Sequence, residues 1–223
     1  MQRSRFIALI EIILNMRYDA VIFDLDGTLL QSTGDDLSWS KEAVGRALEK
    51  QGLEAPESEL MNLSGIRGSQ KFVEACEEIG ADPEELWPVV EGERMEGKKQ
   101  LIESGELELK EGAEELLRFI HEQDVKASVI SNSPDLTVDL VVGEFGLESL
   151  LHYFRGITTF EDLSHRKPDP VHLDYAVAEL GCENPLYVGD SESDEVAAQR
   201  EGIEDVLIGD DVETLSDVED LVD

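Results

Sequence analysis

Short apolar runs rich in β-branched residues alternate along the chain with segments of helical periodicity. The runs lie at residues 21–23, 127–130, 156–159, 186–188 and 206–208. Uninterrupted apolar runs of this length are typical of strands buried on both faces of a parallel sheet. The helical spacing is clearest in two sets, Ala113, Leu116, Leu117 and Ile120, and Leu173, Ala176, Val177 and Leu180. Alternation of this kind predicts an α/β fold with a doubly wound parallel sheet.

Residues 34–108 depart from the alternation. Helical spacing recurs there in three successive segments, at about 39–48, 72–79 and 86–102, with no strand-like run between them. Gly52 and Gly80 follow the first two segments and act as helix stop signals. The pattern predicts an inserted helical domain at 34–108, carried by a core formed from 16–33 and 109–223.

The charge balance of the chain excludes some classes of partner. The 223 residues include 52 acidic and 18 basic ones, for a net charge of −34, yet 41% are hydrophobic. The apolar periodicity predicts a globular protein, while so negative a surface repels nucleic acid and anionic membranes. An acid-rich, lysine-poor surface resembles that of halophilic proteins, in which high salt screens self-repulsion. We therefore expect neither a nucleic-acid nor a membrane partner.

Two cysteines, Cys76 and Cys182, lie far apart in apolar helical contexts. This placement favours buried reduced thiols over a disulfide and fits a cytoplasmic protein. The four histidines, which have no partner at useful spacing, are expected at surface or loop positions.

The N-terminal residues have two interpretations. Residues 6–14 are mostly apolar, but Glu11 interrupts them, and the run is too short to span a membrane. Since Met16 directly precedes the first strand-like run, residues 1–15 are either an extension from a misassigned start or a short helix that packs on the domain or a partner.

Polar residues follow four of the strand-like runs, where ligands collect in open α/β sheets. They are Asp24 and Asp26; Ser131 and Asn132; Lys167; and Asp190 and Asp194. Taken singly, each has an ordinary explanation as a turn residue, a loop lysine or an acid at a helix N-terminus. Because the carboxyl ends of parallel strands share one edge of the sheet, together they predict a single site.

The chemistry of these residue types indicates phosphoryl transfer. Converging carboxylates require a cation, and a ligand set of oxygens without histidine or thiol favours Mg²⁺. One lysine with hydroxyl and amide donors suits a phosphoryl group. An aspartate beside the metal can act as nucleophile, and a second carboxylate two residues on can transfer the proton. The expected intermediate is an aspartyl-phosphate.

The four motifs, DLDGTL, SNS, KPDP and GDSESD, resemble in order and context those of the haloacid dehalogenase superfamily. The resemblance extends from about residue 18 to residue 208. It implies a Rossmann-like core with a helical cap inserted after the first motif. It also implies that Asp24 is the nucleophile and that Asp26 is the general acid and base.

The same resemblance implies roles for the remaining residues. Asp24, the backbone carbonyl of Asp26 and Asp190 would hold Mg²⁺, and Asp194 would support that site from behind its ligands. The phosphoryl-binding residues would be Ser131, Asn132 and Lys167.

The presence of Asp26 favours phosphate esters over carbon–halogen bonds, because an alkoxide leaving group needs an acid. The chain is most similar in kind to phosphoglycolate phosphatases, so we expect a Mg²⁺-dependent phosphatase for a small phosphorylated metabolite. Arg67, in a cap loop at residues 65–68, is the candidate to bind a substrate carboxylate or second phosphate. The alternatives are a phosphosugar mutase of the β-phosphoglucomutase type, although residues 31–40 lack its histidine, and a non-catalytic binding protein. Either a monomer or a homodimer is compatible with the sequence.

Overall fold

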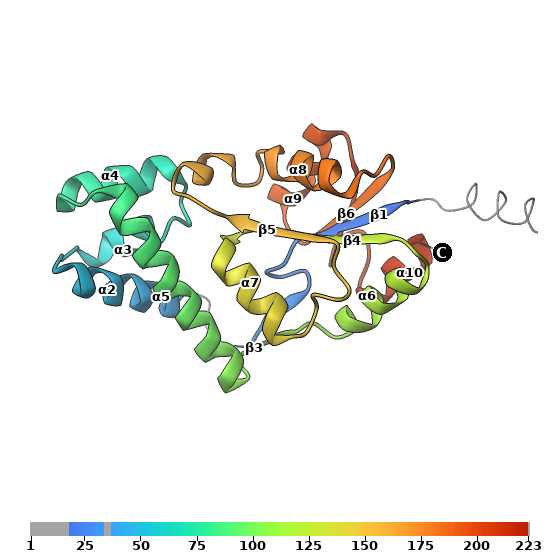
Figure 1. The fold of residues 1–223 in the computed structure, drawn as a ribbon, viewed down its shortest axis with the longest axis horizontal. Helices are drawn as coiled ribbons and strands as arrows, with labels where there is room; N and C mark the ends of the chain where they lie inside the picture. The colour runs from blue at the N-terminus through green and yellow to red at the C-terminus, as the bar shows by residue number, and fades with distance from the viewer. Residues whose placement is uncertain (1–17, 34–36, 223) are drawn as a thin grey trace, which may run out of the picture.

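A parallel five-stranded sheet forms the centre of the molecule (Figure 1). The computed structural model describes residues 18–33 and 37–222. The strands are β1 (Ala20–Phe23), β4 (Lys126–Pro134), β5 (Tyr153–Ile157), β6 (Pro185–Gly189) and β7 (Glu204–Leu207). Their spatial order is β5-β4-β1-β6-β7, and every neighbouring pair is parallel. The predicted α/β fold is confirmed.

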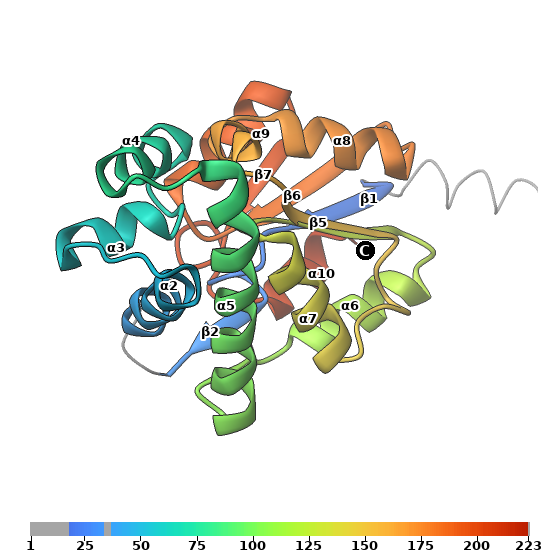
Figure 2. The ribbon, with the colours of Figure 1, turned by 60° about the vertical axis from the view of Figure 1, so that its left-hand side comes forward.

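Helices cover both faces of the sheet (Figures 1 and 2). One face carries α6 (Ala113–Glu122), α7 (Asp135–Glu144) and α10 (Ser216–Val222), and the other carries α8 (Val171–Leu180) and α9 (Glu192–Glu201). The central strand β1 shows why its sequence is apolar throughout. Val21 and Phe23 belong to the apolar cluster on the face covered by α6, α7 and α10, whereas Ala20 and Ile22 belong to the cluster on the face covered by α8 and α9. Burial on two faces leaves no position for a polar side chain.

A separate group of helices lies beside the sheet, at the left of Figure 1. It contains α2 (Ser38–Gln51), α3 (Glu57–Leu63), α4 (Ser69–Ile79) and α5 (Pro83–Ser104). These helices share an apolar cluster that includes Val44, Phe72 and Trp87, with the rings of Phe72 and Trp87 edge to face at 5.4 Å. The sequence predicted three helical segments; the seven-residue α3 was missed because it is too short to show a full helical period.

An antiparallel ribbon joins the two parts. It pairs β2 (Leu30–Ser32) with β3 (Leu107–Leu109), so that Leu30 lies opposite Leu109. The chain therefore enters and leaves the helical group at the same place. The expectation that residues 34–108 contain no strand is wrong at their end, because Leu107 already pairs in β3.

Two strand boundaries differ from the expected ones. The strand expected at 156–159 begins earlier, since Tyr153 and Phe154 pair with β4, and it ends at Ile157. Thr158 cannot extend it because its N–H and hydroxyl both bind the Asp162 carboxylate at the start of the 3-10 helix η1 (Glu161–His165). Strand β4 continues through residues 131–133, which were expected to follow it, with a register shift between Ile130 and Pro134.

The prediction for the two cysteines is confirmed, whereas the prediction for the histidines is wrong at one position. Cys76 and Cys182 are free and buried, as predicted, and burial raises the pKa of Cys76 to about 12. The surface or loop position expected for the histidines is wrong for His172, which is buried on α8. His172 lies next to Leu173 among the buried residues of that helix.

Residues 1–15, for which two interpretations stand, lie outside the described part of the chain. Within residues 18–33 and 37–222, no helix combines the length and apolar character that a membrane crossing needs.

Candidate active site

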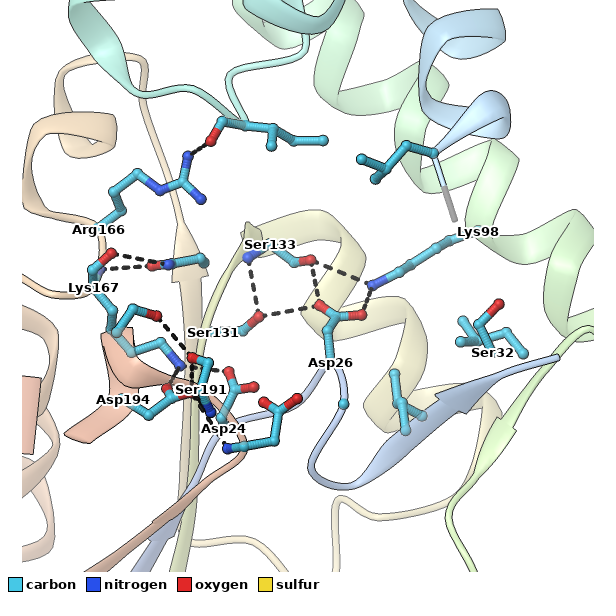
Figure 3. A pocket seen from close by; sticks show the side chains of 18 of the residues that line it. Asp24, Asp26, Ser32, Lys98, Ser131, Ser133, Arg166, Lys167, Ser191 and Asp194 are labelled. Carbon is cyan, nitrogen blue, oxygen red and sulfur yellow. Dashed lines mark hydrogen bonds and ion pairs between the residues drawn. The ribbon is translucent and has the colours of Figure 1, made fainter. Parts of the chain in front are cut away.

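A cavity of about 420 Å³ opens at the carboxyl ends of β1, β4 and β6, beneath α2 and α5 (Figure 3). Seven of the predicted site residues line it: Asp24, Asp26, Ser131, Asn132, Lys167, Asp190 and Asp194. They come from four segments that are far apart in the sequence. The structure therefore brings together all seven core residues that were expected at the strand ends.

Lys167 connects two buried carboxylates at the floor of the cavity. Its Nζ lies 2.5 Å from an oxygen of Asp24 and 2.5 Å from one of Asp194, and it donates to the Tyr187 hydroxyl at 2.9 Å. Burial raises the pKa of Asp24 to about 7, although the charge of Lys167 opposes that rise. Because Lys167 is itself buried, its charge needs these two ion pairs.

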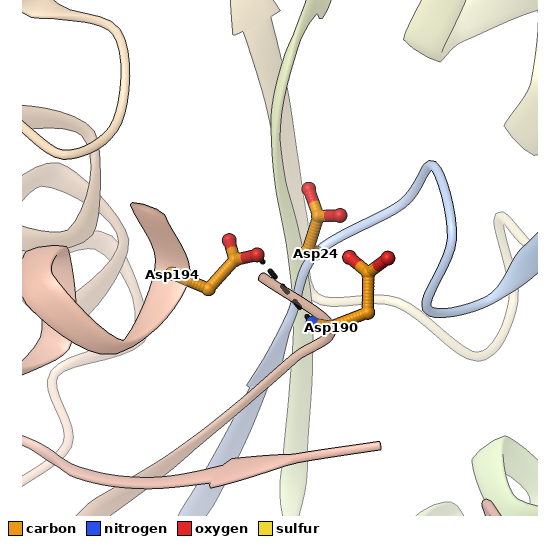
Figure 4. Close-up of side chains that lie close together, drawn as sticks. All are labelled: Asp24, Asp190 and Asp194. Carbon is orange, nitrogen blue, oxygen red and sulfur yellow. Dashed lines mark hydrogen bonds between the residues drawn. The ribbon is translucent and has the colours of Figure 1, made fainter. Parts of the chain in front are cut away.

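Three carboxylates gather beside this lysine (Figure 4). Oxygens of Asp24, Asp190 and Asp194 lie within 4.8 Å of one another. Burial and the neighbouring Asp194 raise the pKa of Asp190, as expected for acids crowded together. An oxygen-only donor set of this kind fits a hard divalent cation such as Mg²⁺.

Local structure fixes each of these acids. Gly27 turns the chain after β1 with φ +96°, and a Cβ on it would lie 2.1 Å from an Asp190 oxygen, so only glycine lets Asp190 sit there. Asp194 is the third residue of α9 and forms a capping box with Ser191. Asp194 thus caps its helix, as the ordinary explanation has it, and also pairs with Lys167 within the group of acids.

The Asp26 carboxylate points away from this cluster and into the cavity (Figure 3). Its side chain is 41% exposed, and it accepts hydrogen bonds from Lys98 and from the Ser133 hydroxyl, the latter at 2.6 Å. Burial alone would raise the pKa of Asp26, but the charge of Lys98 lowers it below the ordinary value. The two acids of the first motif therefore occupy distinct environments.

The polar end of β4 is ordered by hydrogen bonds to its neighbours. The Ser131 hydroxyl lies 3.5 Å from Asp26 Oδ2 and accepts from the Ser133 N–H at 3.0 Å. The Asn132 side chain accepts from the Lys167 N–H at 2.7 Å and donates to the Lys167 carbonyl at 3.2 Å. Asn132 therefore holds the backbone from which the Lys167 side chain extends.

Arg67 is not among the residues that line the cavity. It is exposed, and its Nη1 donates to the Asn62 side chain at 3.2 Å. The same loop contributes Ile66 to the cavity instead. Arg166 donates to the carbonyls of Gly65 and Ile66, and so ties this loop to the segment that carries Lys167.

Two cavity residues that sequence reasoning missed, Arg94 and Lys98, lie on α5. The sequence did carry a signal for them. Trp87, Val90 and Leu101 recur at helical spacing, and positions 94 and 98 fall on the same stripe. Two cations within an apolar stripe are unusual, because buried charges require partners.

The comparisons with known proteins point in one direction. Residues 21–208 match the family described as haloacid dehalogenase-like hydrolase. A phosphoglycolate phosphatase of Cereibacter sphaeroides is 33% identical over 186 residues, which cover 82% of this chain and 81% of that protein. The crystal structure of a predicted phosphoglycolate phosphatase from Haemophilus somnus has a TM-score of 0.64 at 22% identity, over 94% of this chain and all of that one. CbbY from Rhodobacter sphaeroides, solved with phosphate, has a TM-score of 0.63 at 16% identity, over 88% of each chain.

Proposed function

Because the chain belongs to the haloacid dehalogenase-like hydrolase family, we propose that it is a Mg²⁺-dependent phosphatase that hydrolyses a small phosphorylated metabolite through an aspartyl-phosphate on Asp24. The 33% identity to a phosphoglycolate phosphatase supports this substrate class. The observation that carries the proposal is the pair of acids at the end of β1. Asp24 is buried against Lys167, whereas Asp26 faces the cavity.

In the first step, an Asp24 oxygen attacks phosphorus and the bond to the ester oxygen breaks. Lys167 offsets the repulsion between the Asp24 carboxylate and the phosphoryl group, and the Ser131 hydroxyl, which also lines the cavity, supplies a hydrogen-bond donor to the phosphoryl oxygens. Lys98 keeps Asp26 ionised in the free site, so we propose that the negative charge of the bound ester raises the pKa of Asp26 and that it takes up a proton with the substrate. Asp26 then gives this proton to the leaving oxygen, which departs as an alcohol.

In the second step, water attacks the phosphorus and the bond to Asp24 breaks. Asp26, now ionised, accepts the proton of the water, and inorganic phosphate is released with both acids restored. Ser133 and Lys98 orient the Asp26 carboxylate for both transfers.

The acids that would hold Mg²⁺ are Asp24 and Asp190, with Asp194 beside them. The all-oxygen donor set and the fit of Asp190 against Gly27 agree with such an ion. When bound, the ion would supply positive charge for the phosphoryl oxygens.

The test is hydrolysis of an aryl phosphate with and without Mg²⁺. We expect Mg²⁺-dependent release of inorganic phosphate that is lost in Asp24→Asn and retained in Asp210→Asn, an exposed acid outside the cavity. Acid quenching should trap a hydroxylamine-sensitive phosphoryl group on the wild type and none on Asp24→Asn. With a sugar phosphate in place of the aryl phosphate, isomerisation without phosphate release would indicate a mutase. A lack of turnover at every salt concentration would contradict the proposal.

We further propose that the enzyme works in a reducing compartment at high ionic strength. The two buried free thiols support the first point, and the net charge of −34 supports the second. Activity measured across KCl concentrations tests the latter, since a protein adapted to salt should lose activity when the salt is removed.

A further inference from the structure

Basic residues are concentrated at the cavity. Four of the chain's 18 lysines and arginines line it, namely Arg94, Lys98, Arg166 and Lys167. Lys167 is paired with two acids, and Arg166 holds the carbonyls of the loop at Gly65. Arg94 and Lys98 line the cavity from α5, and Lys98 reaches the Asp26 carboxylate.

Arg94 is a buried cation with donors to spare. Only 6% of it is exposed, and its Nη1 donates to the Ser64 carbonyl at 2.8 Å while its guanidinium lies over the Trp39 ring. Its Nε is buried without a hydrogen-bond partner. Among the residues that the structure describes, no carboxylate forms an ion pair with Arg94, although the charges of Asp26 and Glu91 act on it from farther away. Burial outweighs them and lowers the pKa of Arg94 to about 10. A buried guanidinium in this state favours an anionic ligand, because an unpaired charge is costly to bury.

Lys98 lies one helical turn from Arg94 and is equally enclosed. Its Nζ contacts the Asp26 carboxylate and lies 3.3 Å from the Ser133 hydroxyl. Spacing of four residues places both cations on the same face of α5. An anion between them would therefore sit next to the leaving-group side of Asp26.

We propose that Arg94, with Lys98, binds a second anionic group on the leaving group of the substrate. This inference rests on the proposed function and narrows it. The substrate class is a short phosphate ester that carries a carboxylate or a second phosphate, of a size that fits about 420 Å³. The role that the sequence suggested for Arg67 belongs instead to Arg94, which lines the cavity.

The test compares substrates that differ only in the second anion. The wild type should hydrolyse phosphoglycolate with a kcat/KM roughly 10- to 100-fold above that for ethyl phosphate, since hydrogen bonds between charged groups are worth that much. Arg94→Gln should reduce this ratio by a similar factor, and Lys98→Gln should reduce it in the same direction. Ethylene glycol bisphosphate as a third substrate shows whether carboxylate or phosphate is preferred.

Control variants separate binding from structure. Arg46→Gln removes a cap arginine that already pairs with Glu93 outside the cavity, and it should leave the ratio unchanged. If Arg94 only supported the fold through Ser64, both substrates would lose activity together and the proposal would be wrong. The proposal would also be wrong if the preference for phosphoglycolate over ethyl phosphate were lost in Arg67→Gln and kept in Arg94→Gln. Should Arg94→Gln fail to fold, Arg94→Lys and Lys98→Gln make the same comparison.

A binding measurement distinguishes this inference from the proposed function. Calorimetric titration of the Asp24→Asn variant with phosphoglycolate and ethyl phosphate gives two Kd values without turnover. Tighter binding of phosphoglycolate that disappears on adding Arg94→Gln supports the anion subsite even if the wild type hydrolyses nothing. Equal Kd values for the two ligands would overturn the subsite, whether or not aryl phosphate is hydrolysed.

Discussion

Replacing Glu91 with glutamine should stabilise the protein at alkaline pH and change its stability much less at acidic pH. Glu91 lies on α5 with 7% of its surface exposed, and its Oε1 accepts a 3.3 Å hydrogen bond from the Leu136 N–H at the start of α7. Burial raises the pKa of Glu91 to about 7, and the carboxylates of Asp135 and Asp139 act in the same direction. The side chain therefore favours the protonated form at the contact between α5 and α7.

The sign of the effect follows from proton uptake. Between 4.5, the ordinary pKa, and about 7, the unfolded chain has lost the Glu91 proton while the folded chain keeps it. Folding then takes up a proton, so the stability contributed by this group is present at low pH and falls as pH rises through the window. The full displacement is worth about 3 kcal/mol, at roughly 1.4 kcal/mol per pKa unit. Glutamine carries no such cost and retains an oxygen for the Leu136 N–H.

Urea unfolding followed by circular dichroism at constant KCl measures the difference. Between about pH 5 and about pH 8, the stability of Glu91→Gln relative to the wild type should rise by roughly 2–3 kcal/mol. Glu93→Gln is the control on the same helix, because hydrogen bonding to Lys50 lowers the pKa of Glu93. Loss of the Glu93 carboxylate should lower the stability of the protein at neutral pH and should have a smaller effect at acidic pH. Parallel pH profiles for the wild type and Glu91→Gln would refute the reasoning.

Three further predictions concern the site. Lys167→Met should abolish turnover and cost roughly 3–5 kcal/mol of stability in urea unfolding, because it leaves two buried carboxylates without their cation; an unchanged midpoint would contradict this. Gly27→Ala should weaken Mg²⁺ binding in calorimetry and cost about 1–3 kcal/mol, since its Cβ would meet Asp190 at positive φ. Gly52→Ala, also at positive φ but with open space around it, should leave Mg²⁺ binding intact. Chelation of divalent metal should stop aryl phosphate hydrolysis and added Mg²⁺ should restore it, whereas turnover that persists in chelator would contradict the metal assignment.

The sequence predicted the parts of the site that are local to strand ends. Asp24 and Asp190 each follow a buried strand directly, and Lys167 follows β5 after the segment that contains η1, so the topology brings all three to one edge of the sheet. The sheet was predictable for the same reason, because strands buried on both faces leave an apolar run. The end of β5 could not be predicted in this way, because it depends on a hydrogen bond from the Thr158 N–H to Asp162, and the pattern of apolar residues gives no sign of that bond.

The cavity wall formed by α5 was harder to predict. Whether a lysine such as Lys98 on a long helix points to solvent or into a cavity depends on how that helix packs, which the sequence does not state. Arg67 was chosen because its loop resembled one that approaches the site, yet the loop presents Ile66 to the cavity and leaves Arg67 exposed. Loop side chains are set by tertiary contacts, here the bonds from Arg166.

Arg94 and Lys98, as buried cations on the cavity wall of a chain with net charge −34, have a consequence for the kinetics of substrate capture. An anionic substrate diffuses toward a molecule of its own sign and meets attraction only once it is inside the cavity. Salt at about 0.1 M screens charges beyond roughly 10 Å, so it weakens the long-range repulsion more than the short contacts within. Raising ionic strength should therefore speed association while altering dissociation less. For an enzyme that draws anions in with a positive surface, the same change slows capture.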